Sequence, residues 1–304
     1  MSSDLGDPGP FTLGTVQLGQ PYGLGAARSL LDAGAASAVL DTAAAAGIRW
    51  LDTAAAYGQS ESRIGEWHSR TQRRFRIVSK LPSLANISDE DCAAEVARSI
   101  EGSMSRLRCG RIDIYLAHRG ADLLRPPIVA ALRRAQDEEK IGRFGGSVYT
   151  TDDALSVLQV AGVGAMQIPL SAVAQDPVRA GILDRVAARD VALFARSVFL
   201  QGALLLDPER LPPHLAQLAA VNTRMRQIAS EAEISLPGLL VAAVKSFSGV
   251  YSPVLGVDDA RQLSDLVQTA RERSLDRELV EQILAAGRGL PAALVDPRQW
   301  PHEP

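Results

Sequence analysis

Short apolar runs alternate with longer amphipathic stretches along the whole chain. The apolar runs have few polar interruptions, which is typical of strands covered on both faces. They predict strands at residues 14–19, 49–53, 75–80, 112–118, 143–149, 165–169, 191–197 and 251–256. The stretches between them predict helices at residues 35–46, 60–70, 90–107, 127–140, 151–160, 177–189, 213–232 and 259–270, with an extra helix near 235–248.

This alternation predicts an α/β fold, a single (β/α)8 TIM barrel with an extra helix near its C-terminal end. Residues 1–304 contain no linker-like run, so we expect one domain, with flexible ends at 1–10 and 297–304. The rival fold is a doubly wound open sheet, which needs a glycine-rich turn after its first strand. The glycines of residues 19–25 lack the G-x-G-x-x-G spacing of that turn, and this disfavours a Rossmann site.

Composition narrows the function further. The 304 residues carry a formal net charge of −3, which gives no sign of a nucleic-acid partner or an anionic membrane surface. Two cysteines, Cys92 and Cys109, are too few for a metal site and fit a reducing compartment. No apolar stretch reaches the length of a membrane span, and the first residues lack a signal-peptide pattern. We therefore expect a soluble cytoplasmic protein without a metal.

Four reactive side chains lie at or just after the second, third and fourth predicted strands: Asp52, Tyr57, Lys80 and His118. Catalytic groups of parallel barrels lie at the C-terminal strand ends, so we expect these four to meet. Reduction of a carbonyl builds negative charge on its oxygen, which requires a proton donor. We predict Tyr57 as this acid, with its pKa lowered by the Lys80 ammonium. Asp52 is expected to hold Lys80, and His118 to orient the carbonyl.

The segments LDTAAAYGQSESRIGE, IVSKL and DIYLAH, in this order, resemble the aldo-keto reductase superfamily, and the resemblance extends from FTLGTVQLG to VLGVDDARQL. It implies a barrel that binds a nicotinamide dinucleotide in extended form without a Rossmann domain. It also implies the roles just given to the four side chains. The implied function is NAD(P)H-dependent reduction of an aldehyde or ketone, for example a sugar or keto-sugar, to an alcohol.

The same resemblance assigns cofactor contacts. Ser147 and Gln167 match the positions that bind the nicotinamide carboxamide, although Val148 stands where relatives often have Asn. Arg196 replaces a Tyr that stacks on the nicotinamide ring, and its guanidinium is expected either to stack there or to face a carboxylate or phosphate. The residues that match the pyrophosphate cradle are Ser197, Phe199, Gln201, Gly202 and Leu204.

The last predicted strand and helix correspond to the adenine end. Many relatives have Lys or Ser and an Arg there, which grip the 2′-phosphate of NADPH. Arg261 is the one cation nearby, and the matching positions here are Gly256, Val257, Gln262, Asp265 and Leu266. NADPH is expected through the resemblance alone, and NADH is the alternative.

Loops over the predicted barrel mouth supply the candidate substrate contacts Tyr22, Arg119 and Trp300. Tyr22 and Arg119 suggest a polar small-molecule carbonyl substrate. Three other functions remain open: a nicotinamide-binding regulatory subunit, a barrel enzyme that uses Tyr57 and Lys80 for acid–base chemistry without a nicotinamide, and an aldose-type dehydrogenase working in the oxidative direction. Turnover and cofactor binding distinguish the first two from a reductase.

Overall fold

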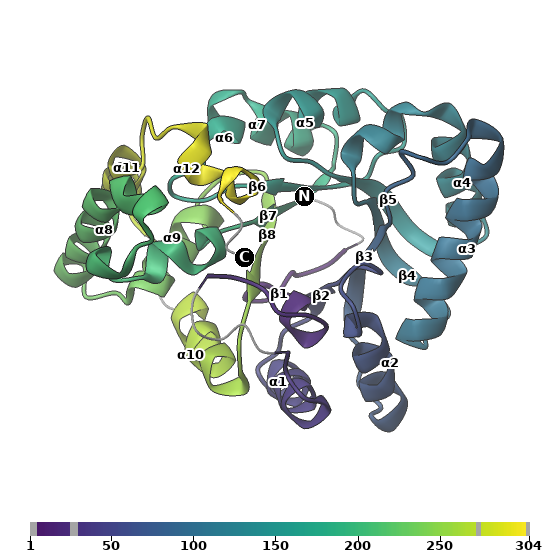
Figure 1. Cartoon of the computed structure of the whole chain (residues 1–304), viewed down its shortest axis with the longest axis horizontal. Helices are drawn as coiled ribbons and strands as arrows, with labels where there is room; N and C mark the ends of the chain where they lie inside the picture. The colour runs from purple at the N-terminus through teal and green to yellow at the C-terminus, as the bar shows by residue number, and fades with distance from the viewer. Residues whose placement is uncertain (1–4, 25–29, 272–274, 302–304) are drawn as a thin grey trace.

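A closed barrel of eight parallel strands, in sequence order, forms the centre of the molecule, and helices surround it (Figure 1). The structure is a computed structural model, which describes residues 5–24, 30–271 and 275–301. The (β/α)8 fold predicted from the alternating pattern is confirmed. Of the two ends that we predicted to be flexible, residues 1–4 and 302–304 lie outside the described residues.

The elements follow one another with short connections. The strands are β1 (Thr12–Gly14), β2 (Trp50–Asp52), β3 (Arg76–Leu81), β4 (Ile112–Ala117), β5 (Ile141–Ser147), β6 (Ala165–Pro169), β7 (Ala192–Arg196) and β8 (Val250–Gly256). The helices are α1 (Ala33–Ala45), α2 (Ser60–Arg70), α3 (Asp89–Leu107), α4 (Pro126–Asp137), α5 (Thr151–Leu158), α6 (Asp176–Arg179), α7 (Ile182–Ala188), α8 (Ala219–Glu231), α9 (Leu236–Lys245), α10 (Ala260–Arg271), α11 (Arg277–Ala286) and α12 (Ala292–Val295).

The first predicted strand is displaced along the chain. Residues 14–19 were expected to be extended, but β1 ends at Gly14 and a short 3-10 turn covers Val16–Leu18. Thr15 ends the strand, because both its backbone N–H and its hydroxyl donate to the Asp52 carbonyl at 2.9 Å. The chain then turns across the barrel mouth, which brings the following residues over the C-terminal strand ends.

Two helical predictions also needed correction. The helix predicted at 177–189 is divided into α6 and α7 by Gly181, whose φ of 66° interrupts the helical conformation. The helix predicted at 213–232 begins as a 3-10 turn at Pro213–Leu218 and becomes α-helical only from Ala219. The sequence pattern missed α11 and α12.

Apolar side chains fill the barrel interior below the C-terminal rim. Trp50, Val78, Leu116 and Phe194 belong to one buried cluster, in which the Trp50 and Phe194 ring centroids lie 5.9 Å apart. Side chains alternate between the two faces of a strand, so the residue two positions later shares the same interior. Those positions are Asp52, Lys80, His118 and Arg196. The alternation therefore places these polar and charged side chains in the barrel interior directly above the apolar cluster.

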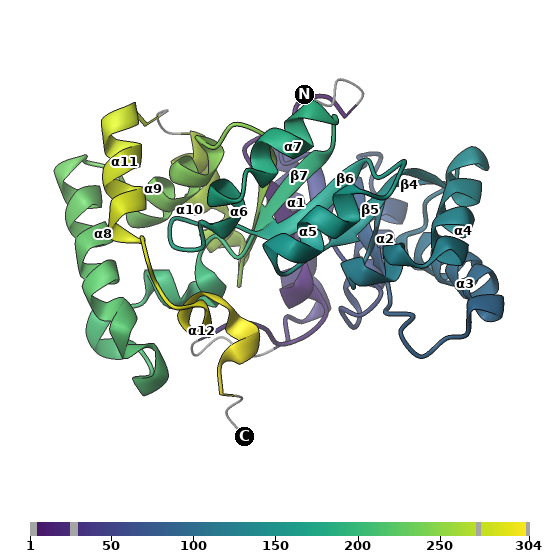
Figure 2. The same cartoon turned by 90° about the horizontal axis from the view of Figure 1, so that it is seen from above.

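A second apolar core lies beside the barrel. It contains residues of α8, α9, α11 and the C-terminal segment, including Trp300. The predicted extra helix near 235–248 is α9, which contacts β8 and α10, whereas α8 contacts α11. Figure 2 shows α11 beside α8, at one end of the molecule. Within the described parts of the chain, no single helix is long and apolar enough to cross a membrane, and one bent pair, Pro213–Glu231 with Leu236–Lys245, passes that test jointly.

Candidate active site

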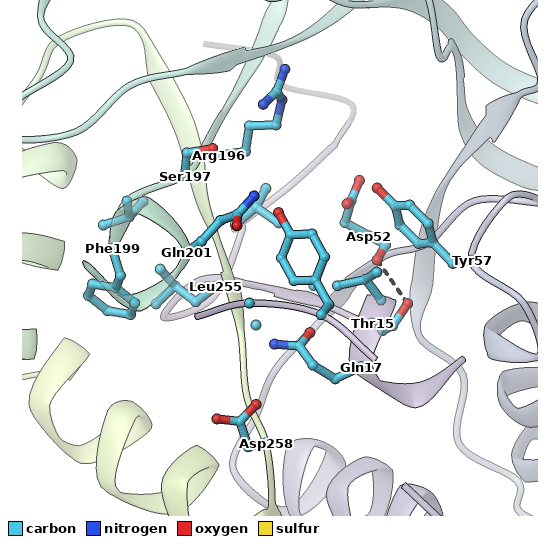
Figure 3. Close-up of a pocket in the computed structure, with 18 of the residues that line it drawn as sticks. Thr15, Gln17, Asp52, Tyr57, Arg196, Ser197, Phe199, Gln201, Leu255 and Asp258 are labelled. Atoms are coloured by element: carbon cyan, nitrogen blue, oxygen red, sulfur yellow. Dashed lines mark hydrogen bonds between the residues drawn. The ribbon is translucent and has the colours of Figure 1, made fainter. Parts of the chain in front are cut away.

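A cavity of about 450 Å³ opens at the C-terminal ends of the strands, and we call it the mouth cavity. Figure 3 shows Asp52 and Tyr57 on one side of it, Arg196 and Ser197 at its upper end and Asp258 at its lower end. Its described lining includes the following predicted residues: Tyr22, Asp52, Tyr57, His118, Ser147, Gln167, Arg196, Ser197, Phe199, Gln201, Gly202, Gly256 and Gln262.

Lys80 lies beneath this lining, bound to Asp52. Its Nζ donates to Asp52 Oδ1 at 2.8 Å and to the Thr53 carbonyl at 2.9 Å. The two side chains are only 1% and 6% exposed, so neither charge is screened by water. Burial alone would lower the pKa of Lys80, but the attraction of Asp52 and Tyr57 outweighs it and raises that pKa above its usual value. The ammonium is therefore held in its charged form.

Tyr57 follows β2 in the loop that leads to α2, and its ring lies over this ammonium. Lys80 Nζ is 4.9 Å from the ring centroid, close enough for its charge to act on the phenol. Lys80 lowers the pKa of Tyr57, as predicted, but the net pKa is raised above its usual value. Burial raises the pKa of the phenol, and the lowering by Lys80 offsets this only in part. Tyr57 therefore keeps its proton at neutral pH, while a cation lies beside the oxygen to stabilise a phenolate.

His118 lies one residue beyond β4, beside Tyr57. The two rings meet edge to face, with their centroids 5.9 Å apart. Burial, followed by the Lys80 ammonium, lowers the pKa of His118 from 6.5 to about 4. The imidazole is therefore neutral at pH 7, and it can donate a hydrogen bond through one ring nitrogen without carrying a charge.

Ser147 and Gln167, expected to bind the nicotinamide carboxamide, lie at the ends of the neighbouring strands β5 and β6. Ser147 is buried at the cavity wall. Gln167 Nε2 donates to Asp52 Oδ1 at 2.8 Å, which fixes the amide and gives the carboxylate a second donor besides Lys80. Gln167 thus also helps to position the Asp52–Lys80 pair, a contact that the sequence did not suggest.

Arg196 stacks on a tyrosine of the protein itself. Its guanidinium carbon lies 4.2 Å from the Tyr149 ring centroid, and Nη2 donates to the Val148 carbonyl at 2.9 Å. Arg298 of the C-terminal segment also stacks on Tyr149, at 3.8 Å, and pairs with Asp296. The C-terminal segment thereby contacts the cavity wall and restrains Arg196 through Tyr149.

The loop after β7 curls around the cavity through unusual backbone conformations. Positive φ angles occur at Ser197 (62°), Leu200 (51°), Gln201 (53°) and Gly202 (95°). Within this loop the Leu200 N–H donates to the Ser197 carbonyl and the Gly202 N–H to the Phe199 carbonyl, both at 2.9 Å, which keeps the turn tight. Leu204, one of the residues matched to the pyrophosphate cradle, is instead buried in the second core.

Val257 and Leu266, which match the adenine end, are buried outside the lining, and four further predicted cofactor or substrate residues also lie away from the mouth cavity. Arg261 and Asp265 are exposed on α10, because their positions on the helix face solvent rather than the strand ends. Arg119 is exposed and pairs with Asp122 at 3.7 Å. Trp300 is only 7% exposed and packs in the second core, with its ring 6.0 Å from that of His214. The structure does not bring these four to the site.

The sequence reading missed Gln17, Tyr149 and Asp258, which line the cavity. Gln17 was assigned to a strand, so its place at the mouth was hidden by the error at β1. Tyr149 and Asp258 each lie two residues beyond the end of a strand, β5 and β8 respectively. A place two residues beyond a strand end could have identified both from the sequence. Arg119 has the same place after β4 but does not line the cavity, so this criterion alone does not decide.

A model of the aldo/keto reductase family matches residues 10–288 of the chain. The chain belongs to the aldo/keto reductase family. It is similar to the uncharacterized oxidoreductase YrpG of Bacillus subtilis, with 25% identity over 290 residues that cover 81% of this chain and 84% of the relative. It is also similar to a 6-dehydroglucose reductase of Novosphingobium aromaticivorans, with 24% identity over 268 residues, 84% of this chain and 86% of the relative.

Solved structures show the same fold in other members of the family or its neighbours. The glycerol dehydrogenase of Gluconobacter oxydans superposes with a TM-score of 0.75 at 20% identity, over 93% of each chain. An aldo-keto reductase of Bacillus halodurans gives 0.75 at 18% identity, over 96% of this chain and 95% of that one. The chain is thus an oxidoreductase of this family by sequence and has the fold of these structures.

Proposed function

We propose that this protein reduces the carbonyl group of a small polar aldehyde or ketone to an alcohol, using a reduced nicotinamide dinucleotide, with Tyr57 as the proton donor. The observation that carries this proposal is the buried contact of Tyr57 with the Lys80–Asp52 pair, next to a neutral His118 at the cavity wall. Such a constellation donates a proton and stabilises the resulting anion, which is what reduction of a carbonyl requires.

The residues of the mouth cavity fit a nicotinamide dinucleotide. The volume of the cavity, about 450 Å³, lies in the range of small-molecule sites. A Cβ at Gly256 would lie 2.7 Å from the Gln17 amide, so the glycine lets this amide lie against the end of β8 at the cavity wall. Gln17 Oε1 is buried in this cavity without a hydrogen-bond partner among the described residues. Ser147 and Gln167 would hold the carboxamide, and the loop at Ser197–Gly202 would hold the pyrophosphate.

The residues of the proposed site share the chemistry among them. When bound, the reduced dinucleotide would supply the hydride that the carbonyl carbon accepts. Tyr57 gives its phenolic proton to the carbonyl oxygen, and the Lys80 ammonium stabilises the phenolate that remains. Asp52 keeps this ammonium in place, and Gln167 keeps Asp52 in place. Neutral His118 donates a hydrogen bond to the same oxygen and fixes the direction of the carbonyl without competing for the proton.

We propose a sugar or keto-sugar as the substrate class. Polar groups at the mouth support this choice, because Gln20, Tyr22 and Tyr149 line the cavity and Tyr22 is 41% exposed. Hydroxyl and amide groups hydrogen-bond well with a polyol, whereas an apolar substrate would leave them unpaired. The similarity to a 6-dehydroglucose reductase also supports it. The cytoplasmic location and the single-domain organisation of residues 1–304 remain our expectations.

A matched substrate panel tests the proposal. Oxidation of the reduced nicotinamide is followed with oxidised sugars and with simple aldehydes and ketones of similar size that lack hydroxyl groups. We expect kcat/KM for the best sugar to exceed that of its apolar counterpart by about tenfold or more. Cofactor binding without turnover of any carbonyl would point to a regulatory subunit. Absence of binding would point to acid–base chemistry without a nicotinamide.

A further inference from the structure

The end of the mouth cavity at β8 is built from one carboxyl group and two amides. Asp258 follows β8, and its backbone N–H donates to Gln262 Oε1 at 2.6 Å. The side chains of Asp258, Gln17 and Gln262 all line this end of the cavity. In Figure 3, Gln17 lies above and to the right of Asp258. The backbone contact to Gln262 holds the turn that places Asp258 at the wall of the cavity.

Positive charge is distant from this end. Arg196 is the one Lys or Arg in the described lining, and it stacks on Tyr149 at the other end. Arg261, which the resemblance suggested as a phosphate ligand, is exposed on α10 and outside the lining. Asp259, adjacent in the chain, adds a second negative charge nearby. The described part of this end is therefore negatively charged.

We infer that Asp258, together with Gln17, selects NADH over NADPH by accepting hydrogen bonds from the diol of the adenosine ribose. This inference rests on the proposed function and replaces the NADPH preference expected from the sequence. A carboxylate only accepts hydrogen bonds, and Gln17 Oε1 is a second acceptor that lacks a partner among the described residues. A ribose diol offers two O–H donors to these acceptors.

A 2′-phosphate cannot take the place of this diol, because it offers no hydrogen-bond donor and carries negative charge. As a dianion at neutral pH it has acceptors where the site needs donors, so its oxygens would face the oxygens of Asp258 and Gln17. Like charges in contact at a binding site cost enough to change affinity by about tenfold or more. Dinucleotide sites elsewhere use the same chemistry, with an acidic residue for the ribose hydroxyl of NADH and an Arg for the phosphate of NADPH.

Equilibrium binding to the full-length protein tests the inference without relying on turnover. NADH and NADPH are titrated by nicotinamide fluorescence, and ADP-ribose and 2′-phospho-ADP-ribose by calorimetry, because these two lack the nicotinamide. We expect each ligand without the 2′-phosphate to bind about tenfold or more tightly than its phosphorylated partner. Equal ratios in the two pairs would locate the discrimination at the adenosine end.

Two isosteric substitutions locate the discriminating charge. Asp258→Asn removes the carboxylate that faces the cavity, and the preference should fall to about threefold or less. Asp259→Asn is the matched control: it removes a neighbouring charge but keeps the oxygen that accepts from the Gln262 N–H. Its preference should remain that of the unmodified protein.

Three results would overturn the inference. NADPH binding as tightly as NADH would contradict the selection, and an unchanged preference in Asp258→Asn would remove Asp258 from it. Either result would leave the proposed carbonyl reduction intact. Failure of the unmodified protein to bind any of the four ligands would contradict the proposed function as well.

Discussion

Lys80 Nζ lies 2.8 Å from Asp52 Oδ1, and both side chains are almost completely removed from water. The attraction between them therefore has to offset the cost of burying two charges. Thr53 and Gln167 supply the remaining hydrogen bonds, one to each partner. The pair holds a permanent positive charge beside Tyr57, which is the property that the proposed chemistry needs.

Removing one member of this pair should be costly. In Lys80→Met the Asp52 carboxylate stays buried with only the Gln167 amide as a donor, and we expect the free energy of unfolding to fall by about 3 kcal/mol or more. Turnover should be lost as well, because the phenolate has no counter-charge. Urea denaturation and a carbonyl reduction assay measure the two effects.

The double variant Lys80→Met/Asp52→Asn is the control for this experiment. It removes both charges, so about 1 kcal/mol or more of the lost stability should return, while the activity should not. A double variant as unstable as Lys80→Met would show that packing, rather than an unpaired charge, determines the cost.

The strand ends could be predicted because the pattern that identifies a strand also identifies its last residue. Asp52, Lys80 and His118 each end or directly follow an apolar run, and in a parallel barrel all such ends meet at one rim. The loops were less predictable. Trp300 looked like a mouth residue, but the second core that buries it involves helices far apart in the sequence, which no local pattern reveals.

The direction of the net pKa shifts also could not be predicted from the sequence. The sequence shows that Lys80 can lie near Tyr57, but the sign of the pKa shift depends on how deeply the phenol is buried. The placement of Asp258 rather than Arg261 in the cavity depends in the same way on the exact turn after β8. Asp258 lies in the turn before α10 and Arg261 in the first turn of that helix, and only the structure shows which of the two faces the cavity.

His118 should make the folded state sensitive to acid. Its pKa falls from 6.5 in a water-exposed imidazole to about 4 in the folded protein. Between these values the unfolded chain binds a proton that the folded protein does not, so stability decreases as pH falls from about 6.5 to about 4. This group contributes at most about 3 kcal/mol of that loss. Urea denaturation at several pH values measures it.

The comparison protein is His118→Gln, which keeps hydrogen-bonding groups but does not titrate. Its stability should decrease less than that of the unmodified protein over the same pH window. Identical pH dependence in the two proteins would mean that His118 does not have the lowered pKa.

Gly145 in β5 permits close approach of the neighbouring strand. A Cβ at this position would lie 1.7 Å from the Ala165 carbonyl oxygen, a backbone atom that cannot move without disturbing β6. Gly145→Ala should therefore lower the free energy of unfolding by about 3 kcal/mol or more. It should also reduce activity, since Ser147 follows on the same strand. Thermal or urea denaturation measures the first effect.

Gly110→Ala provides the matched substitution, because Gly110 is exposed and a Cβ there would meet no atom within 4 Å. We expect a change of about 0.5 kcal/mol or less. Equal stability of the two variants would contradict the close contact of Gly145 in β5 with Ala165 in β6.

The most direct measurement is the reduction rate of Tyr57→Phe, with Tyr251→Phe as the control. Both changes delete one phenolic oxygen, but Tyr251 lies at the opposite end of the barrel, where its hydroxyl donates to the Leu5 carbonyl. A positioned general acid accelerates a reaction by about a hundredfold or more, so kcat of Tyr57→Phe should fall by at least that factor. Its affinity for the cofactor should change little. Tyr251→Phe should retain its activity. A Tyr57→Phe protein that turns over at the unmodified rate would contradict the assignment of Tyr57 as the proton donor.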